Sequence, residues 1–256
     1  MRNSLQRLQY RLGRQGLFVR DGLALTWQAL GSLPAISKLP VRRAFYKQLL
    51  FSGIQSMGYV GAIGILSGLI LVVQVHNLIG HNELLTLHVL IWVIVRELGP
   101  LLAAIVIISR SSSAIASELA AMQVNGEIDC LRRMGVSPVS YMVMPRILGM
   151  TLASLALAFY FQVVAIGTGM VVSSWMLDLA LMNEAANFFD MISFLEMTIA
   201  VLKSVCFGVI VSAASCYYGL AIKRALTEIP KAASRAVIRS LLAVFVCDGV
   251  ITMLFF

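Results

Sequence analysis

Five long apolar stretches constrain the fold of this chain more than any other feature. They cover roughly 49–75, 84–108, 139–177, 194–222 and 240–256. Most of them reach the ~20 residues that a helix needs to cross a hydrocarbon core about 30 Å thick. In lipid the backbone must satisfy its own hydrogen bonds, and the stretches lack the alternating pattern of barrel strands. We therefore expect an all-α integral membrane protein with five transmembrane helices.

The stretch at 139–177 is longer than one span requires. It could hold a single long tilted helix, or one span followed by a re-entrant piece. A complete extra span would reverse the later loops and place the basic segment 223–239 outside, against its charge. We therefore expect one span in this stretch.

Positively charged residues are concentrated in three segments, which predicts the orientation. The chain carries 20 Lys and Arg against 12 Asp and Glu, a formal net charge of +8. All but two of the basic residues lie within 1–47, 110–146 or 223–239, whereas the loop around 177–193 contains acids and no base. By the positive-inside rule the basic segments are cytoplasmic, so the N-terminus is expected inside and the C-terminus outside. Membrane orientation and anionic lipid explain the basic excess better than nucleic acid does.

Residues 1–30 are predicted to form an amphipathic interfacial helix. Leu5, Leu8 and Leu12 fall on one face, with a row of Arg on another. An organellar transit peptide is the alternative, because the stretch is rich in Arg and has a single acid. Pro34 and Pro40 predict an elbow before the first span. We divide the chain into 1–45, the interfacial helix and elbow, and 46–256, the transmembrane domain.

A short charged helix is predicted between the second and third spans. Asn125 can cap its start, acids occupy the first turn and bases the last, and Gly135 and Pro138 end it. Ile128, Leu131 and Met134 are predicted to share one face. In a membrane protein, such a helix is a surface for a cytoplasmic partner.

Charge within a span is costly and rarely without a role, and four such residues matter here. They are Arg96, Glu97, Lys203 and Asp248. Two are positive and two negative, so a balanced cluster inside the bundle would reconcile all four with lipid. Such a cluster could simply lock helices together, or it could break and reform as the protein changes shape. Gly99-Pro100 comes directly after Arg96-Glu97-Leu98 in the second span. Its proline predicts a kink in that helix, which could act as a hinge.

Small residues predict two places of close helix packing. Gly64 and Gly68 are four residues apart in the first span, a spacing that lets membrane helices approach closely. A second stripe with the same spacing follows the second span and consists of Ser109, Ser113, Ser117 and Ala121.

The sequence predicts no metal site and no catalytic site. Cys130, Cys206, Cys216 and Cys247 have no paired spacing and are interpreted as small buried hydrophobes. His76, His81 and His88 lack the spacing and partners of zinc ligands. The chain has no phosphate-binding Walker loop and no nucleophile elbow. We expect no enzyme activity, so energy for active transport must come from another protein.

Taken in order, these motifs resemble the MlaE/YrbE permease family, the membrane subunits of ABC transporters that work with MCE-domain proteins. The resemblance covers roughly 45–256. The blocks that carry it are Arg96-Glu97-Leu98-Gly99-Pro100, Ser113-Ala114 with Ser117-Glu118-Leu119, Ile128-Asp129-x-Leu131 through Met134-Gly135-Val136-x-Pro138, Pro145-Arg146, Lys203-Ser204, Ser215-Cys216-Tyr217 with Gly219, Ser234-Arg235-Ala236-Val237, and Asp248 with Thr252.

The resemblance implies a homodimeric permease in the bacterial inner membrane, with the C-terminus periplasmic. Two cytoplasmic ABC ATPase subunits would bind a coupling helix at 127–135, through Glu127, Ile128, Asp129, Leu131, Arg132 and Met134. ATP and Mg²⁺ would bind to those ATPases, with no cofactor in this chain. An MCE-domain (MlaD-like) protein would lie on the outer side, and a STAS-type accessory subunit fits the same scheme.

The implied cargo is lipid, typically phospholipid moved between membranes to maintain outer-membrane lipid asymmetry. It would pass through a cavity at the dimer interface, and Gln74, Val75 and Leu78 are candidate lining residues. Two departures from the family pattern place the ATPase and accessory contacts in question. Asn125-Gly126 replaces the usual Thr-Glu, and 222–230 is bulkier and more basic than the usual Gly-rich loop.

Two other functions stay open. The chain could be a membrane scaffold that docks an MCE-domain protein and moves nothing. It could also be a secondary transporter or channel that uses the buried charges as a proton path, although it lacks an internal inverted repeat.

Overall fold

The computed structural model describes residues 26–28, 31, 39–79, 89–177, 194–222 and 225–255. Most of the predicted interfacial helix at 1–30 lies outside the described residues, as do Pro34, His81 and His88. The described helices are α2 (Leu39–Leu49), α3 (Gln55–Ile79), α5 (Gly99–Ile107), α6 (Ser113–Val124), α7 (Glu127–Arg133), α8 (Met144–Leu177), α10 (Phe194–Leu220) and α11 (Ile229–Leu254). Wider π-helical turns join some of them, namely η2 (Leu50–Ile54), η3 (Trp92–Leu98), η4 (Ile108–Ser112) and η5 (Val139–Val143), and a 3-10 turn, η6 (Leu226–Glu228), precedes α11.

Five helical stretches of the described chain are long and apolar enough to cross a membrane, which confirms the expected spans. They are Leu39–Leu78, Val89–Val124, Val139–Trp175, Phe194–Leu220 and Leu226–Leu254. The third is one helical stretch, as expected. The first begins ten residues earlier than its apolar stretch because the helix continues through the basic residues of α2. Pro40 lies in the first turn of α2, where its missing N–H costs nothing, and an elbow before this span would fall in 32–38, outside the described residues.

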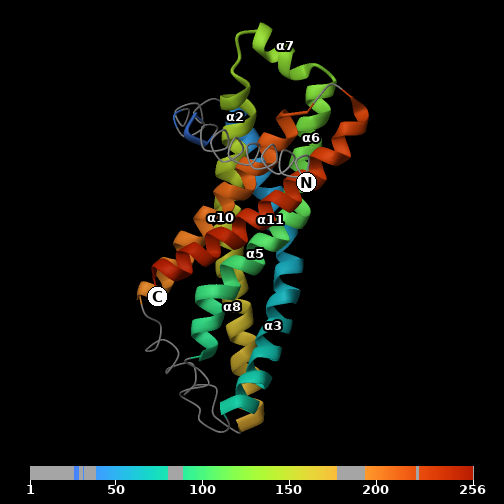
Figure 1. The fold of residues 1–256 in the computed structure, drawn as a ribbon. Helices are drawn as coiled ribbons and strands as arrows, with labels where there is room; N and C mark the ends of the chain where they lie inside the picture. Colours follow the sequence, from blue (N-terminus) through green and yellow to red (C-terminus); the bar gives the residue numbers. More distant parts are fainter. Residues whose placement is uncertain are drawn as a thin grey trace, which may run out of the picture.

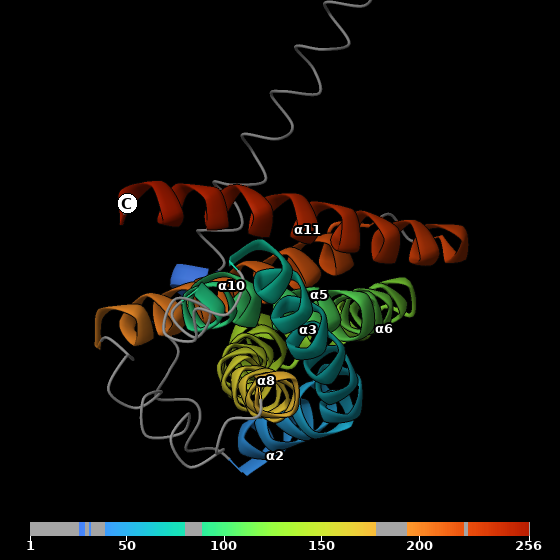
Figure 2. The same cartoon turned by 90° about the horizontal axis from the view of Figure 1, so that it is seen from below.

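The helices form a bundle around α8, which packs against α2, α3, α5 and α10 (Figures 1 and 2). Viewed along the bundle, α11 lies along one edge beside α10, and α2 lies on the opposite edge (Figure 2). The fourth span is the most buried and the fifth the least. Large apolar side chains of α11, such as Phe245 and Val250, are therefore exposed on its outer face. The short helix α7 lies at one end of the bundle (Figure 1).

Close packing of α3 on α8 depends on the predicted glycine pair. Gly64 faces Val164, and a methyl group at Gly68 would overlap the backbone carbonyl oxygen of Ala165. The second predicted stripe is not buried in the same way, because Ser109 is exposed and Ser113 and Ser117 are half-buried. The contact of this span with α10 instead uses the fully buried Ser112, where the Ser215 hydroxyl donates to Ser112 Oγ at 2.8 Å.

Replacing Gly68 with alanine is expected to destabilise the protein by about 1–3 kcal/mol, because α3 must move away from α8. Gly58 is the matched control on the same helix, since a methyl group there would meet nothing within 4 Å. Gly58→Ala should leave stability unchanged or raise it slightly. SDS-driven unfolding in mixed micelles measures both variants. Equal effects from the two substitutions would contradict this account of the α3–α8 contact.

The predicted kink at Pro100 takes the form of a π-helical turn. In η3 the Gly99 N–H donates to the carbonyl of Ile94, five residues earlier. The same pattern would pair the next residue, Pro100, with Val95, but proline has no N–H to donate. Gln162 of α8 fills this place, with its Nε2 donating to the Val95 carbonyl oxygen at 3.1 Å. A side chain from the central helix thus satisfies the acceptor that the proline leaves.

Gln162→Leu is expected to cost about 1–2 kcal/mol, because it leaves the buried Val95 carbonyl without a donor. Thr168→Val on the same helix is the control. Its hydroxyl donates at 2.8 Å to Val164 within α8, so its loss strands no carbonyl of another helix. We expect the control to lie within about 0.5 kcal/mol of the parent in the same unfolding measurement. If Thr168→Val is as unstable as Gln162→Leu, the proposed role of Gln162 as donor to the Val95 carbonyl is contradicted.

Candidate functional site

The structure brings together the four intramembrane charges that the sequence predicts to cluster. Glu97 lies on η3, Lys203 on α10 and Asp248 on α11. The fully buried Lys203 Nζ lies 2.6 Å from Glu97 Oε2 and 2.8 Å from Asp248 Oδ1. It also donates to Thr252 Oγ1 at 2.8 Å. We call Arg96, Glu97, Lys203, Asp248 and Thr252 the charge network.

Arg96 extends this network to the end of α11. Its Nε lies 3.7 Å from Glu97 Oε1, and its Nη2 donates to the Phe255 carbonyl oxygen at 3.1 Å. The guanidinium lies 5.6 Å from the ring centre of Trp92, within the range of a cation–π contact. Two cations and two carboxylates balance, so the network ties η3, α10 and α11 together without burying a net charge.

Thr252 also belongs to the network, although it is uncharged and so is not marked by the search for charges within the spans. Its hydroxyl donates to Glu97 at 3.2 Å while accepting from Lys203. The sequence does contain a signal for it, because Thr252 follows Asp248 by four residues and therefore shares its helix face. The Phe255 carbonyl, a backbone group, has no such signal.

Arg110 is a further charged residue within a span. The sequence groups it with the basic segment 110–146, but in the structure it lies in η4 within the second span. Its guanidinium donates to the backbone carbonyl and, at 2.7 Å, to Oε1 of Gln55. It also lies 5.7 Å from the ring centres of Phe51 and Tyr59. Arg110 thus joins the second span to the first.

The predicted helix between the second and third spans is α7. Gly126, with φ of 77°, is its N-cap residue, and Asn125 does not cap it as expected. The Asn125 amide instead contacts Glu127 Oε1 at 3.2 Å. At the other end, Val136 N donates to the Leu131 carbonyl and Gly135 N to the Arg132 carbonyl, which is a Schellman motif. Gly135 takes the left-handed conformation (φ 76°) that this motif needs, as its predicted role at the end of the helix requires.

The three apolar residues of α7 do not share one face. Ile128 is 1% exposed, Leu131 packs against the apolar core, and Met134 is 63% exposed. Residues six apart on an α-helix point about 120° away from each other, and Met134 already lies beyond the last helical residue. Ile128 therefore holds α7 against the bundle. The exposed surface of α7 consists of Glu127, Cys130, Arg132 and Arg133, and Met134 continues it directly after the helix.

The candidate cavity residues lie toward the end of α3. Gln74 and Leu78 are exposed and share a face four residues apart, whereas Val75 is buried against the core. Of the cysteines interpreted as buried, Cys216 is buried, whereas Cys130 is exposed and Cys206 and Cys247 are half-buried. Across the described ranges, no group of three His, Cys, Asp or Glu lies close enough together to hold a metal.

Comparison with known proteins gives a consistent result. Residues 45–254 match the family model of the permease MlaE. A probable ABC transporter permease of Rickettsia prowazekii is 28% identical over 82% of each chain. A probable ABC transporter permease of Synechocystis is 29% identical over 84% of this chain and 82% of the relative. The protein TRIGALACTOSYLDIACYLGLYCEROL 1 of Arabidopsis thaliana, a chloroplast protein, is 30% identical over 63% of this chain and 46% of its own length.

Proposed function

The chain belongs to the MlaE permease family and is a multi-pass membrane permease of an ABC transporter, and from this premise we propose that it moves phospholipid between membranes. The family implies an ATPase partner, and this chain has no phosphate-binding loop of its own. ATP and Mg²⁺ would therefore bind to the partner ATPase, which would hydrolyse the ATP. The name of the Arabidopsis relative contains that of a galactolipid, which supports a lipid as the cargo class.

The observation that carries the proposal is the way α7 is held. It projects from one end of the bundle (Figure 1), and its exposed surface is charged. Ile128, which is 1% exposed, anchors it and lines a cavity together with Tyr217 and Leu220 of α10. α7 packs against α6, and α6 packs in turn against α10 and α11, which carry Lys203 and Asp248 of the charge network. A mechanical connection thus runs from the coupling surface into the spans.

The remaining assignments are parts of the same proposal. We place the α7 end in the cytoplasm, the C-terminus in the periplasm and the chain in a bacterial inner membrane, on the distribution of basic residues. Two copies would pair through exposed apolar faces that include Gln74 and Leu78, with lipid between them. An MCE-domain protein would lie at the outer side, and a STAS-type subunit could join the ATPases.

The test begins with the complex isolated from its own membrane in mild detergent. We expect native mass spectrometry to find two copies of this chain, two ATPase subunits, an MCE-domain oligomer and retained lipid. After reconstitution with labelled phospholipid, ATP should drive lipid transfer and a non-hydrolysable ATP analogue should not. A complex that holds the MCE-domain protein without any ATPase would instead support a scaffold.

A further inference from the structure

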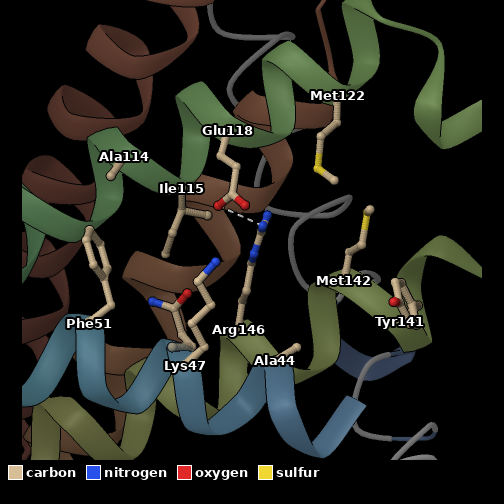
Figure 3. Close-up of a pocket in the computed structure, with 11 residues that line it drawn as sticks. Ala44, Lys47, Phe51, Ala114, Ile115, Glu118, Met122, Tyr141, Met142 and Arg146 are labelled. Atoms are coloured by element: carbon tan, nitrogen blue, oxygen red, sulfur yellow. Dashed lines mark ion pairs between the residues drawn. The ribbon is translucent and has the colours of Figure 1, made fainter. Parts of the chain in front are cut away.

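A cavity of about 360 Å³ lies between α2, α6 and the start of α8, apart from the charge network. Figure 3 shows Lys47 of α2 and Arg146 of α8 pointing from below toward Glu118 of α6. Phe51, Ile115, Met122 and Met142 provide apolar walls. The volume falls in the range of small-molecule sites, and apolar walls with a few converging polar groups are typical of such sites.

The cations of this cavity are incompletely paired. Arg146 Nη2 lies 2.9 Å from Glu118 Oε2. Arg146 Nη1 is covered by protein and has no hydrogen-bond partner among the described residues. Lys47 is exposed, and the described chain offers it no ion pair or hydrogen bond. With one carboxylate against two cations, the cavity has an excess of one positive charge and, in Lys47, an accessible donor for an oxyanion.

The position of the cavity along the bundle indicates which kind of oxyanion it would bind. It lies toward the α7 end of the bundle, where α6 runs into α7 and α8 begins. The apolar side chains and the basic heads meet there, as at the boundary between acyl chains and headgroups. Basic pockets between membrane helices on the cytoplasmic side are suited to anionic lipid headgroups.

We propose that this cavity binds the headgroup phosphate of one anionic phospholipid of the adjacent leaflet, through Lys47 and Arg146. Lys47 supplies an exposed ammonium group to the phosphate, and the guanidinium of Arg146, which Glu118 holds through Nη2, adds its positive charge. The acyl chains extend along the apolar side chains at the cavity wall. This lipid is separate from any cargo at a dimer interface. Only its assignment to the cytoplasmic leaflet rests on the proposed function, so failure of transport would leave the binding site intact.

The test is a lipid titration of the detergent-solubilised protein in its isolated assembly, with bound lipid counted by native mass spectrometry. We expect phosphatidylglycerol to bind and Lys47→Gln to weaken that binding about tenfold, the loss typical of one charge-assisted hydrogen bond. Arg43→Gln is the matched control, because Arg43 is exposed on the same helix and does not line the cavity. It should leave binding unchanged.

Glu118→Gln provides a change in the opposite direction. It removes the carboxylate that competes for Arg146, so phosphatidylglycerol should bind more tightly, a gain that general damage to the fold would not produce. Lys47 and Glu118 are both solvent-exposed, so both variants should fold. Three results would each overturn the proposal: no retained phosphatidylglycerol, equal losses in Lys47→Gln and Arg43→Gln, or displacement of the lipid by millimolar inorganic phosphate. The last would assign the cavity to a free anion.

Discussion

Replacing Lys203 with methionine is expected to destabilise the protein more than any other single substitution in its spans. Lys203 is the only cation within ion-pair distance of both Glu97 and Asp248 in the described chain. Its loss leaves two half-buried carboxylates with Arg96 as their one cation, and Arg96 reaches Glu97 alone at 3.7 Å. Removing one partner of a buried ion pair typically costs about 3–5 kcal/mol. We expect a loss of that size in SDS-driven unfolding, with a sharp fall in the yield of folded protein.

The double variant Lys203→Met with Asp248→Asn tests the reason for this loss. It removes one cation and one anion, so Arg96 and Glu97 remain as a balanced pair. If uncompensated charge causes the instability, the double variant should recover much of the stability that the single variant lost. A double variant as unstable as Lys203→Met would show that the lysine matters for packing instead.

The same pair of variants separates the two interpretations of the charge network. If the network only locks helices together, the double variant should recover transport along with stability. If the network must break and reform during the transport cycle, stability should return while ATP-driven lipid transfer stays lost. Transfer is measured in vesicles that contain equal amounts of folded protein, so differences in yield do not enter.

The fold was predictable where one physical requirement dominates. An apolar stretch of sufficient length must form a helix in lipid, so the number of spans follows from the sequence. The four intramembrane charges need partners of opposite sign, so a common cluster is a sound expectation. The start of the first span was missed because Arg42, Arg43 and Lys47 interrupt the apolar pattern without interrupting the helix. Apolarity locates the lipid-embedded segment, not the helix ends.

Details that depend on packing against another helix could not be read from the sequence. Pro100 predicts an irregularity, but only the structure shows that Gln162 supplies the missing donor. For α7, the sequence lists apolar positions without saying which of them faces the bundle. A seven-residue helix has too few turns to define a continuous apolar face. Only the structure therefore shows that Ile128 is the residue buried against the bundle.

Substituting Met134 with aspartate is expected to weaken ATPase association by roughly thirtyfold. Met134 is the large apolar side chain that the α7 segment exposes most, at 63%. A buried interface anchor is worth about 2 kcal/mol or more when removed, and every 1.4 kcal/mol is tenfold in Kd. Leu131→Asp would be less informative, because Leu131 packs against the core and its loss also damages the fold.

Leu226→Asp is the control for this measurement. Leu226 is 71% exposed on η6, outside α7, so the two substitutions introduce the same charge at comparable exposure. The Kd of the purified ATPase for each variant, measured on the protein in nanodiscs, gives the comparison. If α7 is the coupling surface, Met134→Asp should lose both association and ATP-driven lipid transfer, while Leu226→Asp keeps them. Full ATPase binding by Met134→Asp would move the coupling surface elsewhere on the chain.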